Sequence, residues 1–342
     1  MSVEGPLALA GEARLAATLD PGQRALPAVD LAATGVGRGV VRLDVTGPGG
    51  FAVRREAAIW SRPARAAVAV AAGGEIAPGA TFDASPPADR FLPGTWRASL
   101  TLGGAVRYDA GALVASLNAY PLACLEQSAS KGFPLALLPD GPVAGADRAG
   151  RLQAAVASVL DRQRYDGGFA MWSSAGEAET WLSLYAVEFL WRARQAGAAV
   201  PDAAMRDALR YVAESSDDGS SDAAAVAAQA YRLYLLALAD RPRSGAARVL
   251  LERVGSLPTP LAKAHVGAAL ALARDMPRAE RAFDAALRSF ERRWWSADYG
   301  TSLRDQAAVA VLLRESGIGG DRLAKLAAAL PGADLSADAL ST

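Results

Sequence analysis

The stretch AYPLACLEQSASKGFPLALL, Ala119–Leu138, holds the only cysteine of the chain, Cys124. Gln127 follows three residues later, with Leu125 and Glu126 between the two. Residues i and i+3 lie on one face of a helical turn, so the side chains of the cysteine and the glutamine can meet there. The stretch therefore predicts an apolar helix with the cysteine at its head and the glutamine in its first turn.

This pairing permits one specific reaction. The Cys124 thiolate attacks the Gln127 carboxamide carbon, ammonia leaves, and an internal thioester closes. A nearby amine or hydroxyl can then open the thioester, which leaves a covalent amide or ester and releases the thiol. The plainer interpretation of Cys124 is a buried free thiol that packs as a small hydrophobic side chain.

The composition limits the other chemistry that the chain can perform. Its 342 residues predict two or more domains, and 51% hydrophobic with 21% charged residues is typical of folded proteins. Lys plus Arg equals Asp plus Glu at 36 each, so no nucleic-acid partner is expected. One cysteine and one histidine, His265, exclude an internal disulfide and most zinc sites, and we expect no cofactor.

The chain also lacks signals for membrane contact. No apolar run approaches the length that crosses a bilayer. The N-terminal residues MSVEGPLALAGEARL have no basic region followed by a long apolar stretch. We therefore expect no export signal in this chain and no direct membrane contact by it.

The first hundred residues have the pattern of β-strands. GRGVVRLDVTGPGGFAVRREAAIWSRP alternates apolar and polar residues around the turn GPGG, which predicts a β-hairpin. The short runs ARAAVAV, ATFDA and TWRASLTL lie between Gly/Pro turns. Together they predict an antiparallel sandwich, or pieces of two, with Pro63 at the seam between two β modules.

After about Tyr108 the pattern becomes helical. DAGALVASLNAY has apolar residues at helical spacing, and polar breaks rich in Gly, Pro and Asp separate the segments that follow. Antiparallel helices with short connections stack as a solenoid or close into an α/α toroid. The predicted helices are Asp147–Gln163, Ala178–Gln195, Asp202–Ala213, Asp222–Ala239, Leu261–Arg274, Arg278–Arg292, Ser302–Ser316 and Asp321–Leu330.

Several segments resemble, in the same order, the thioester region of bacterial alpha-2-macroglobulins. The opening stretch is similar to the family pattern Tyr-Pro-Tyr-Gly-Cys-Leu-Glu-Gln-Thr-Thr-Ser. Before it, SRPARAAV resembles an Arg-Pro-rich boundary between β modules, and GTWRASLTL resembles the strand that leads into the thioester domain. After it, RYDGGFAMWSS, AETWLSLYAVEFLWRARQAGAAVP and DYGTSLRDQAAVAVLL resemble a glycine–tryptophan turn and two helices of that domain. The resemblance covers nearly the whole chain.

The resemblance implies three parts and a larger parent protein. Residues 1–62 would be the C-terminal part of a macroglobulin-like β domain, 63–107 the first part of a CUB-like β module, and 108–342 an α/α-toroid thioester domain truncated at its C-terminus. In the family this region follows many β-sandwich domains and an exposed bait segment, so we expect a fragment. Leu122-Ala123 and Ser128-Ala129 depart from the family's Tyr-Gly and Thr-Thr, but the reacting atoms are all present.

The resemblance also implies a function: broad-spectrum inhibition of endopeptidases rather than enzyme catalysis. In the family a target protease cleaves the bait, the thioester is exposed, and a lysine amine of the protease is acylated. By this resemblance Cys124 is the leaving thiol, Gln127 is the acyl donor, and Glu126 belongs to the motif with its role open. The family is commonly periplasmic, so the parent protein is expected in the periplasm or cell envelope, where a lipid anchor is possible.

A thioester has to be kept from water, because hydrolysis destroys it. Met171 and Trp172, beside the DGG turn, are the main candidates for a shield, and Tyr165 and Tyr185 are further ones. The plainer interpretation of these side chains is core packing. His265 lies on an alanine-rich helix and is interpreted as a helix histidine without a catalytic role.

Two other classes of function fit parts of the sequence. The turn DGGFAMW superficially resembles the glycine–tryptophan repeats of toroid enzymes such as cyclases, prenyltransferases and glycosidases. An Asp-x-Asp-Asp motif is absent and too few Cys and His residues exist for a prenyltransferase zinc, but paired carboxylates for glycoside hydrolysis stay open. The third class is a helical binding scaffold in which Cys124 is inert.

Overall fold

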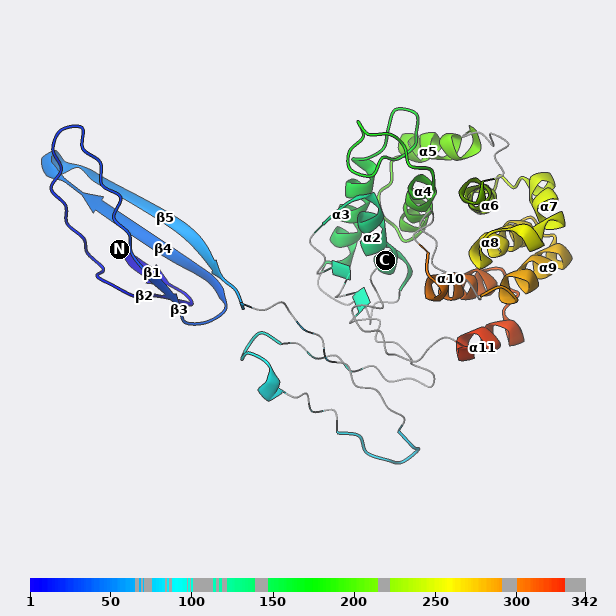
Figure 1. The fold of residues 1–342 in the computed structure, drawn as a ribbon, viewed down its shortest axis with the longest axis horizontal. Coiled ribbons are helices and arrows are strands. Elements are labelled where there is room, and N and C mark those ends of the chain that lie inside the picture. Colours follow the sequence, from blue (N-terminus) through cyan, green and yellow to red (C-terminus); the bar gives the residue numbers. More distant parts are fainter. Residues whose placement is uncertain are drawn as a thin grey trace. The chain divides into compact units, whose positions relative to one another are not determined.

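The chain divides into two compact units, Met1–Leu100 and Thr101–Thr342 (Figure 1). The computed structural model describes residues 1–64, most of 76–100, 122–138, 147–214, 222–290 and 300–329, with isolated positions at 68, 70, 113, 114, 117 and 118. Among these residues all strands lie in the first unit and all α-helices of defined bounds lie in the second. The predicted change from strands to helices is thus confirmed.

A long β-hairpin dominates the first unit. Strands β4 (Gly37–Thr46) and β5 (Ala52–Ser61) pair antiparallel from Thr46 opposite Ala52 to Gly37 opposite Ser61. The 3-10 turn η1 (Pro48–Gly50) joins them, with Gly49 and Gly50 at φ values of 69° and 80°. Such backbone angles favour glycine, so the GPGG sequence explains where the chain reverses. The predicted hairpin is confirmed.

Shorter strands complete two small sheets. Strand β1 (Ser2–Glu4) pairs antiparallel with β4, which gives a sheet of order β1-β4-β5. Strands β2 (Leu7–Leu9) and β3 (Leu31–Ala33) form a separate antiparallel pair. Among the described residues of this unit only Gly39 is buried. Ladder hydrogen bonds and exposed ion pairs, rather than a hydrophobic core, therefore hold these strands together.

Residues 63–107 were predicted to begin a second β module. Their described positions contain the short 3-10 helix η2 (Ala88–Arg90) and no strand. The runs ARAAVAV and TWRASLTL fall partly outside the described residues, and the helical pattern DAGALVASLNAY falls largely outside them. The CUB-like module and the other two predicted domain types consequently stay predictions.

The second unit is built from helices joined by short connections. The predicted helices from residue 147 onward are all present, although α9 begins and ends earlier than predicted, and α7 was not predicted. Their bounds are α2 (Leu125–Leu137), α3 (Arg148–Leu160), α4 (Thr180–Gln195), α5 (Asp202–Glu214), α6 (Ala223–Leu238), α7 (Ser244–Glu252), η3 (Val254–Ser256), α8 (Pro260–Leu272), α9 (Met276–Leu287), α10 (Ser302–Glu315) and α11 (Gly320–Ala329).

These helices form an inner and an outer row. Helices α2, α4, α6, α8 and α10 each pack on the next in that order, while α3, α5, α9 and α11 pack on α2, α4, α8 and α10 (Figure 1). Helix α8 is buried on nearly every side, as expected for a sequence that is apolar all round. This alternation agrees with the predicted stack of antiparallel helices, and a closed toroid stays a prediction.

Side-chain caps begin several of the inner helices, and a glycine allows α2 to pack closely on α4. Asp222, Thr259 and Thr301 cap α6, α8 and α10 by accepting hydrogen bonds from backbone N–H groups in the first turn. Gly132 lets α2 approach α4 closely, because a Cβ there would lie 2.3 Å from the Phe189 ring. Helix α2 is therefore held at a fixed distance from the core.

Candidate thioester site

Cys124 is the N-cap residue of α2 and is buried, with 7% of its surface exposed. Its backbone N–H donates to the side-chain oxygen Oε1 of Gln127 at 3.1 Å, and the two residues form a capping box. The hydrogen bond folds the Gln127 carboxamide back over the cysteine. The structure thus brings the Gln127 side chain onto the backbone of Cys124, the residue with which the sequence paired it.

This arrangement suits acyl chemistry. The carboxamide carbon is bonded to Oε1, so it is held beside the residue that carries the thiol. Attack by sulfur on that carbon would place negative charge on Oε1, and the Cys124 N–H already points at this atom. A fixed donor at a developing oxyanion is a strong catalytic effect, because the donor needs no reorganisation.

The backbone on either side of Cys124 is held by other parts of the unit. The Leu125 N–H donates to the backbone carbonyl of Met171 at 2.9 Å. On the other side, Arg162 Nη2 donates to the carbonyl oxygen of Ala123. These two contacts fix the residues before and after the cysteine, and so fix the direction from which its side chain leaves the chain.

Arg162 was missed by sequence reasoning. It follows α3 and is half-buried, and its guanidinium also donates to the carbonyl of Ser158 and, at 3.2 Å, to the Ser158 hydroxyl. That hydroxyl lies 2.9 Å from the hydroxyl of Ser128 in α2. A network of side chains at the end of α3 therefore supports the first turn of α2.

The turn that carries Met171 is anchored to α4. The short bridges Gln163–Phe169 and Ala170–Ala178 shape it. Ser183 Oγ accepts from the Phe169 N–H at 2.9 Å and donates to the Phe169 carbonyl at 3.1 Å. Gly167 has a φ of 92°, and a Cβ there would lie 2.2 Å from a backbone oxygen of α5. The glycines of the YDGGF sequence are therefore required for this turn.

Glu126 points to a different set of partners. Ser130 Oγ donates to its carboxylate, and the Ser130 and Tyr185 hydroxyl oxygens lie 3.0 Å apart. Burial raises the pKa of the Tyr185 hydroxyl well above its ordinary value, so the phenol stays protonated. The Tyr185 ring packs on Phe133 of α2 with 4.8 Å between centroids. These contacts join α2 to α4.

The four side chains proposed as a shield lie in different surroundings. Met171 and Tyr185 are both partly buried against the core, and the Tyr185 ring packs on Phe133. The rings of Trp172 and Tyr165 are 64% and 90% exposed. The structure thus places Met171 next to the cysteine segment and leaves two aromatic rings accessible in this chain, and the shielding role stays a prediction.

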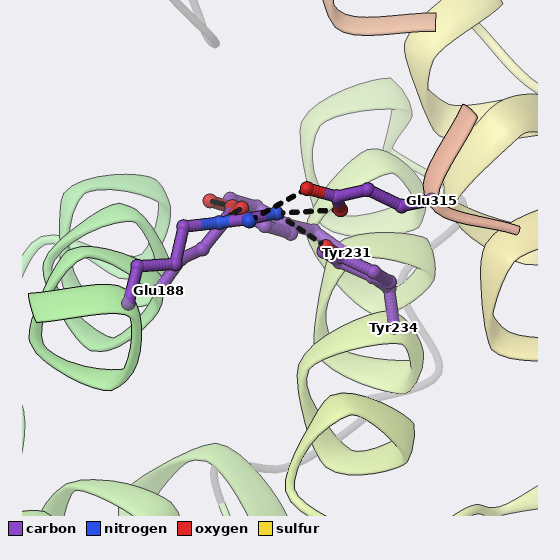
Figure 2. Close-up of polar contacts among 5 residues, drawn as sticks. Glu188, Tyr231, Tyr234 and Glu315 are labelled. Atoms are coloured by element: carbon purple, nitrogen blue, oxygen red, sulfur yellow. Dashed lines mark hydrogen bonds and ion pairs between the residues drawn. The ribbon is translucent and has the colours of Figure 1, made fainter. Parts of the chain in front are cut away.

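A second polar cluster lies between the inner helices (Figure 2). Arg192 of α4 contacts Glu188 at 2.7 Å, Glu315 of α10 at 2.8 Å and the Tyr234 hydroxyl at 2.9 Å. The Tyr231 hydroxyl donates to Glu188. Burial opposes the charge on Arg192, but its hydrogen bond to Glu315 and the two carboxylates raise the pKa of Arg192 above its ordinary value. Helices α4, α6 and α10 meet at this cluster.

His265 lies in the same core, on α8. Its ring stacks on Tyr231 with 4.3 Å between centroids and on Tyr234 with 5.4 Å. Burial, helped by the charge of Arg304, lowers the pKa of His265 from 6.5 to about 3, so the ring is neutral at physiological pH. Among the described residues its Nδ1 atom has no hydrogen-bond partner. This position is consistent with a core histidine.

The described residues offer neither a metal site nor a membrane-spanning helix. No group of three or more His, Cys, Asp or Glu side chains lies where it could hold a metal ion. No helix of the described ranges is long and apolar enough to cross a membrane.

The chain is similar to curated alpha-2-macroglobulins of bacteria. It is 32% identical to that of Escherichia coli (strain K12) over 345 residues, which cover 92% of this chain and 21% of the relative. It is 30% identical to that of Xylella fastidiosa over 247 residues, 67% of this chain and 15% of the relative. The chain belongs to the bacterial alpha-2-macroglobulin family. No family model matches it.

Solved structures agree with this assignment. The native conformation of the E. coli alpha-2-macroglobulin aligns with 96% of this chain and 22% of its own, at a TM-score of 0.75 and 29% identity. A Salmonella alpha-2-macroglobulin reacted with methylamine aligns with 96% of this chain and 23% of its own, at a TM-score of 0.76 and 29% identity. A trypsin-activated form of the E. coli protein aligns with 96% of this chain and 24% of its own, at a TM-score of 0.57 and 27% identity. This chain spans between 15% and 21% of the length of the curated relatives.

Proposed function

We propose that this chain carries the internal thioester of an alpha-2-macroglobulin that traps endopeptidases. The observation that supports it best is the 3.1 Å hydrogen bond that folds the Gln127 acyl group onto Cys124 at the start of α2. The thiol would attack the carboxamide carbon and ammonia would depart with the thiol proton. The product is a Cys124–Gln127 thioester.

The stored acyl group would then be transferred to the target. A lysine amine of the protease attacks the thioester carbon, an amide bond forms, and Cys124 leaves as the free thiol. Each molecule reacts once, so the protein inhibits by capture and is not an enzyme. The protease-activated and methylamine-reacted structures of relatives support proteases and amines as the reaction partners.

The family assignment supports further proposals about the parent protein. Residues 1–62, 63–107 and 108–342 would be parts of a macroglobulin-like domain, a CUB-like module and an α/α-toroid thioester domain. The protein would act in the periplasm or cell envelope, and a lipid anchor in the parent would hold it near the membrane. Residues Met171, Trp172, Tyr165 and Tyr185 would help to keep the thioester from water, with neighbouring domains covering the exposed rings.

Labelling with a fluorescent primary amine tests the acyl transfer. The full chain should incorporate the label at Gln127 and expose one thiol in the same reaction. Cys124→Ala removes the nucleophile, and Gln127→Asn shortens the acyl arm by one methylene, so neither variant should be labelled. If hydrolysis precedes labelling, residue 127 should read as glutamate in the wild-type chain and as glutamine in Cys124→Ala.

The opposite result supports an inert cysteine. In that case the wild-type chain keeps glutamine at position 127 and takes up no label, or it is labelled to the same extent as Cys124→Ala. Either result would leave the helical scaffold or a toroid enzyme as the better interpretation.

A further inference from the structure

The peptide group that joins Ala123 to Cys124 is hydrogen-bonded at both ends. Its carbonyl oxygen accepts from Arg162 Nη2, and its N–H donates to Gln127 Oε1 at 3.1 Å. Hydrogen bonds in a chain polarise one another, and a charged donor at a carbonyl makes the N–H of the same peptide group a stronger donor. The guanidinium thus acts on the acyl oxygen through one peptide group.

We propose that Arg162 is a positioning residue for the acyl chemistry at Gln127. The inference rests on the proposed thioester, and Arg162 itself touches no reacting atom. When sulfur attacks the carboxamide carbon, the carbonyl π electrons move to Oε1, and the Cys124 N–H stabilises that charge. When an amine later attacks the thioester carbon, the same oxygen takes the charge again. Arg162 therefore supports both steps.

The surroundings of Arg162 suit this role. It is fixed by the Ser158 carbonyl and hydroxyl, and its own backbone carbonyl accepts from Ala170 at 3.2 Å. Among the described residues no carboxylate forms an ion pair with it, so no neighbouring anion neutralises its charge. A half-buried charge that is held in place loses little freedom when the oxyanion forms.

The chain offers a matched control in Arg148. This arginine is the first residue of α3 and donates to two backbone carbonyls at the end of α2, with Nε 2.8 Å from the oxygen of Leu135 and Nη2 2.6 Å from the oxygen of Leu138, the C-cap residue. These two hydrogen bonds are at the C-terminal end of α2, away from Cys124. Both arginines lie at an end of α3 and donate to backbone carbonyls next to an end of α2, but only Arg162 contacts the peptide group that bonds Gln127.

One experiment reads the polarisation directly. Because the chain has a single cysteine, labelling with [15N]cysteine gives one backbone amide signal, that of Cys124. Arg162→Gln should move the Cys124 amide proton upfield, and Arg162→Lys should move it less because a positive charge remains. Arg148→Gln should leave the signal in place. A signal unmoved in both Arg162 variants, with helix content retained, would overturn the inference.

The second readout is the rate at which residue 127 reacts with methylamine, followed by mass spectrometry of the full chain. Arg162→Gln should react about tenfold more slowly than wild type, less than the 100-fold or greater loss on removal of a direct oxyanion donor. The rate of Arg162→Lys should lie between those of Arg162→Gln and wild type, and the rate of Arg148→Gln should match wild type. Equal slowing by Arg162→Gln and Arg148→Gln would indicate a purely structural role and overturn the inference.

The two readouts separate this inference from the proposed function. If the wild-type chain never converts Gln127, the thioester proposal fails, whereas the amide signal still tests the contact of Arg162. If the wild-type chain converts Gln127 but substitution of Arg162 changes neither the Cys124 amide shift nor the methylamine rate, only the present inference fails.

Discussion

Glu126 shows at the scale of single residues how the motif divides its tasks. Cys124 and Gln127 face each other at the N-terminus of α2, whereas Glu126 contacts Ser130, whose hydroxyl lies next to that of Tyr185. The middle residue of the motif therefore anchors the helix to α4. Glu126 thus lies between Cys124 and Gln127 in sequence without joining the hydrogen bond between them.

Tyr185→Phe should destabilise the helical unit by about 1 kcal/mol, because it removes one buried hydroxyl hydrogen bond and keeps the ring. The free energy of unfolding measured with urea gives the comparison. Tyr165→Phe is the control, since that ring is 90% exposed and should change stability by less than about 0.5 kcal/mol. Equal losses in both variants would contradict a stabilising role for the part-buried Glu126–Ser130–Tyr185 contact.

His265 should make stability fall in acid. The pKa of His265 is about 3 in the folded chain, whereas an unburied histidine, as in the unfolded chain, has a pKa of 6.5. The unfolded chain therefore binds the proton more tightly. Stability from this residue is complete above pH 6.5 and is lost as pH falls toward 3, at up to about 1.4 kcal/mol per pH unit. His265→Phe keeps a ring against Tyr231 and should have a flatter profile between pH 6.5 and 4.5. Parallel profiles would show that His265 does not titrate in this way.

Sequence reasoning at the residue scale reaches partners that are near in the chain. The spacing of Cys124 and Gln127 predicted that their side chains can meet, and in the structure the Gln127 side chain accepts from the Cys124 backbone N–H across one helical turn. Arg162 could not be found in this way, since it lies 39 residues from the carbonyl that it contacts. The exposure of Tyr165 was equally hidden, because an aromatic side chain near a turn has no local signal for its burial.

At the scale of elements, Arg192 joins helices that are far apart in sequence. It lies on α4, is 7% exposed, and contacts Glu315 at the end of α10. Arg192→Met should cost roughly 3 kcal/mol, because it leaves the largely buried Glu188 carboxylate without its cationic partner. Arg194→Met is the control, since the Arg194–Asp202 pair is exposed and should contribute less than about 1 kcal/mol. Similar losses in urea unfolding would contradict a role for the buried cluster.

Helix prediction followed the strength of the local signals. Asp222, Thr259 and Thr301 cap helices that begin within one residue of the predicted starts. Helix α7 (Ser244–Glu252) was missed because it is short and has no side-chain cap at Arg243. The row of inner helices, by contrast, depends on contacts across the unit that no local pattern specifies.

At the scale of the whole chain, the two units differ in what stabilises them. All buried hydrophobic side chains of the described residues lie in the second unit, from Val114 to Leu326. The cooperative unfolding transition should therefore belong to Thr101–Thr342. Limited trypsin digestion of the full chain should remove the first unit and leave the melting temperature of the transition nearly unchanged. A transition that is lost or strongly lowered after this cleavage would show that the units stabilise each other.

The intact mass of the full chain, with titration of its single thiol, tests the thioester most directly. The expected result is a mass lower by one ammonia with a masked thiol, or, after hydrolysis, glutamate at position 127 that Cys124→Ala does not acquire. A folded chain with a free Cys124, and with glutamine at position 127 as stable as Gln153 and Gln163, would contradict it.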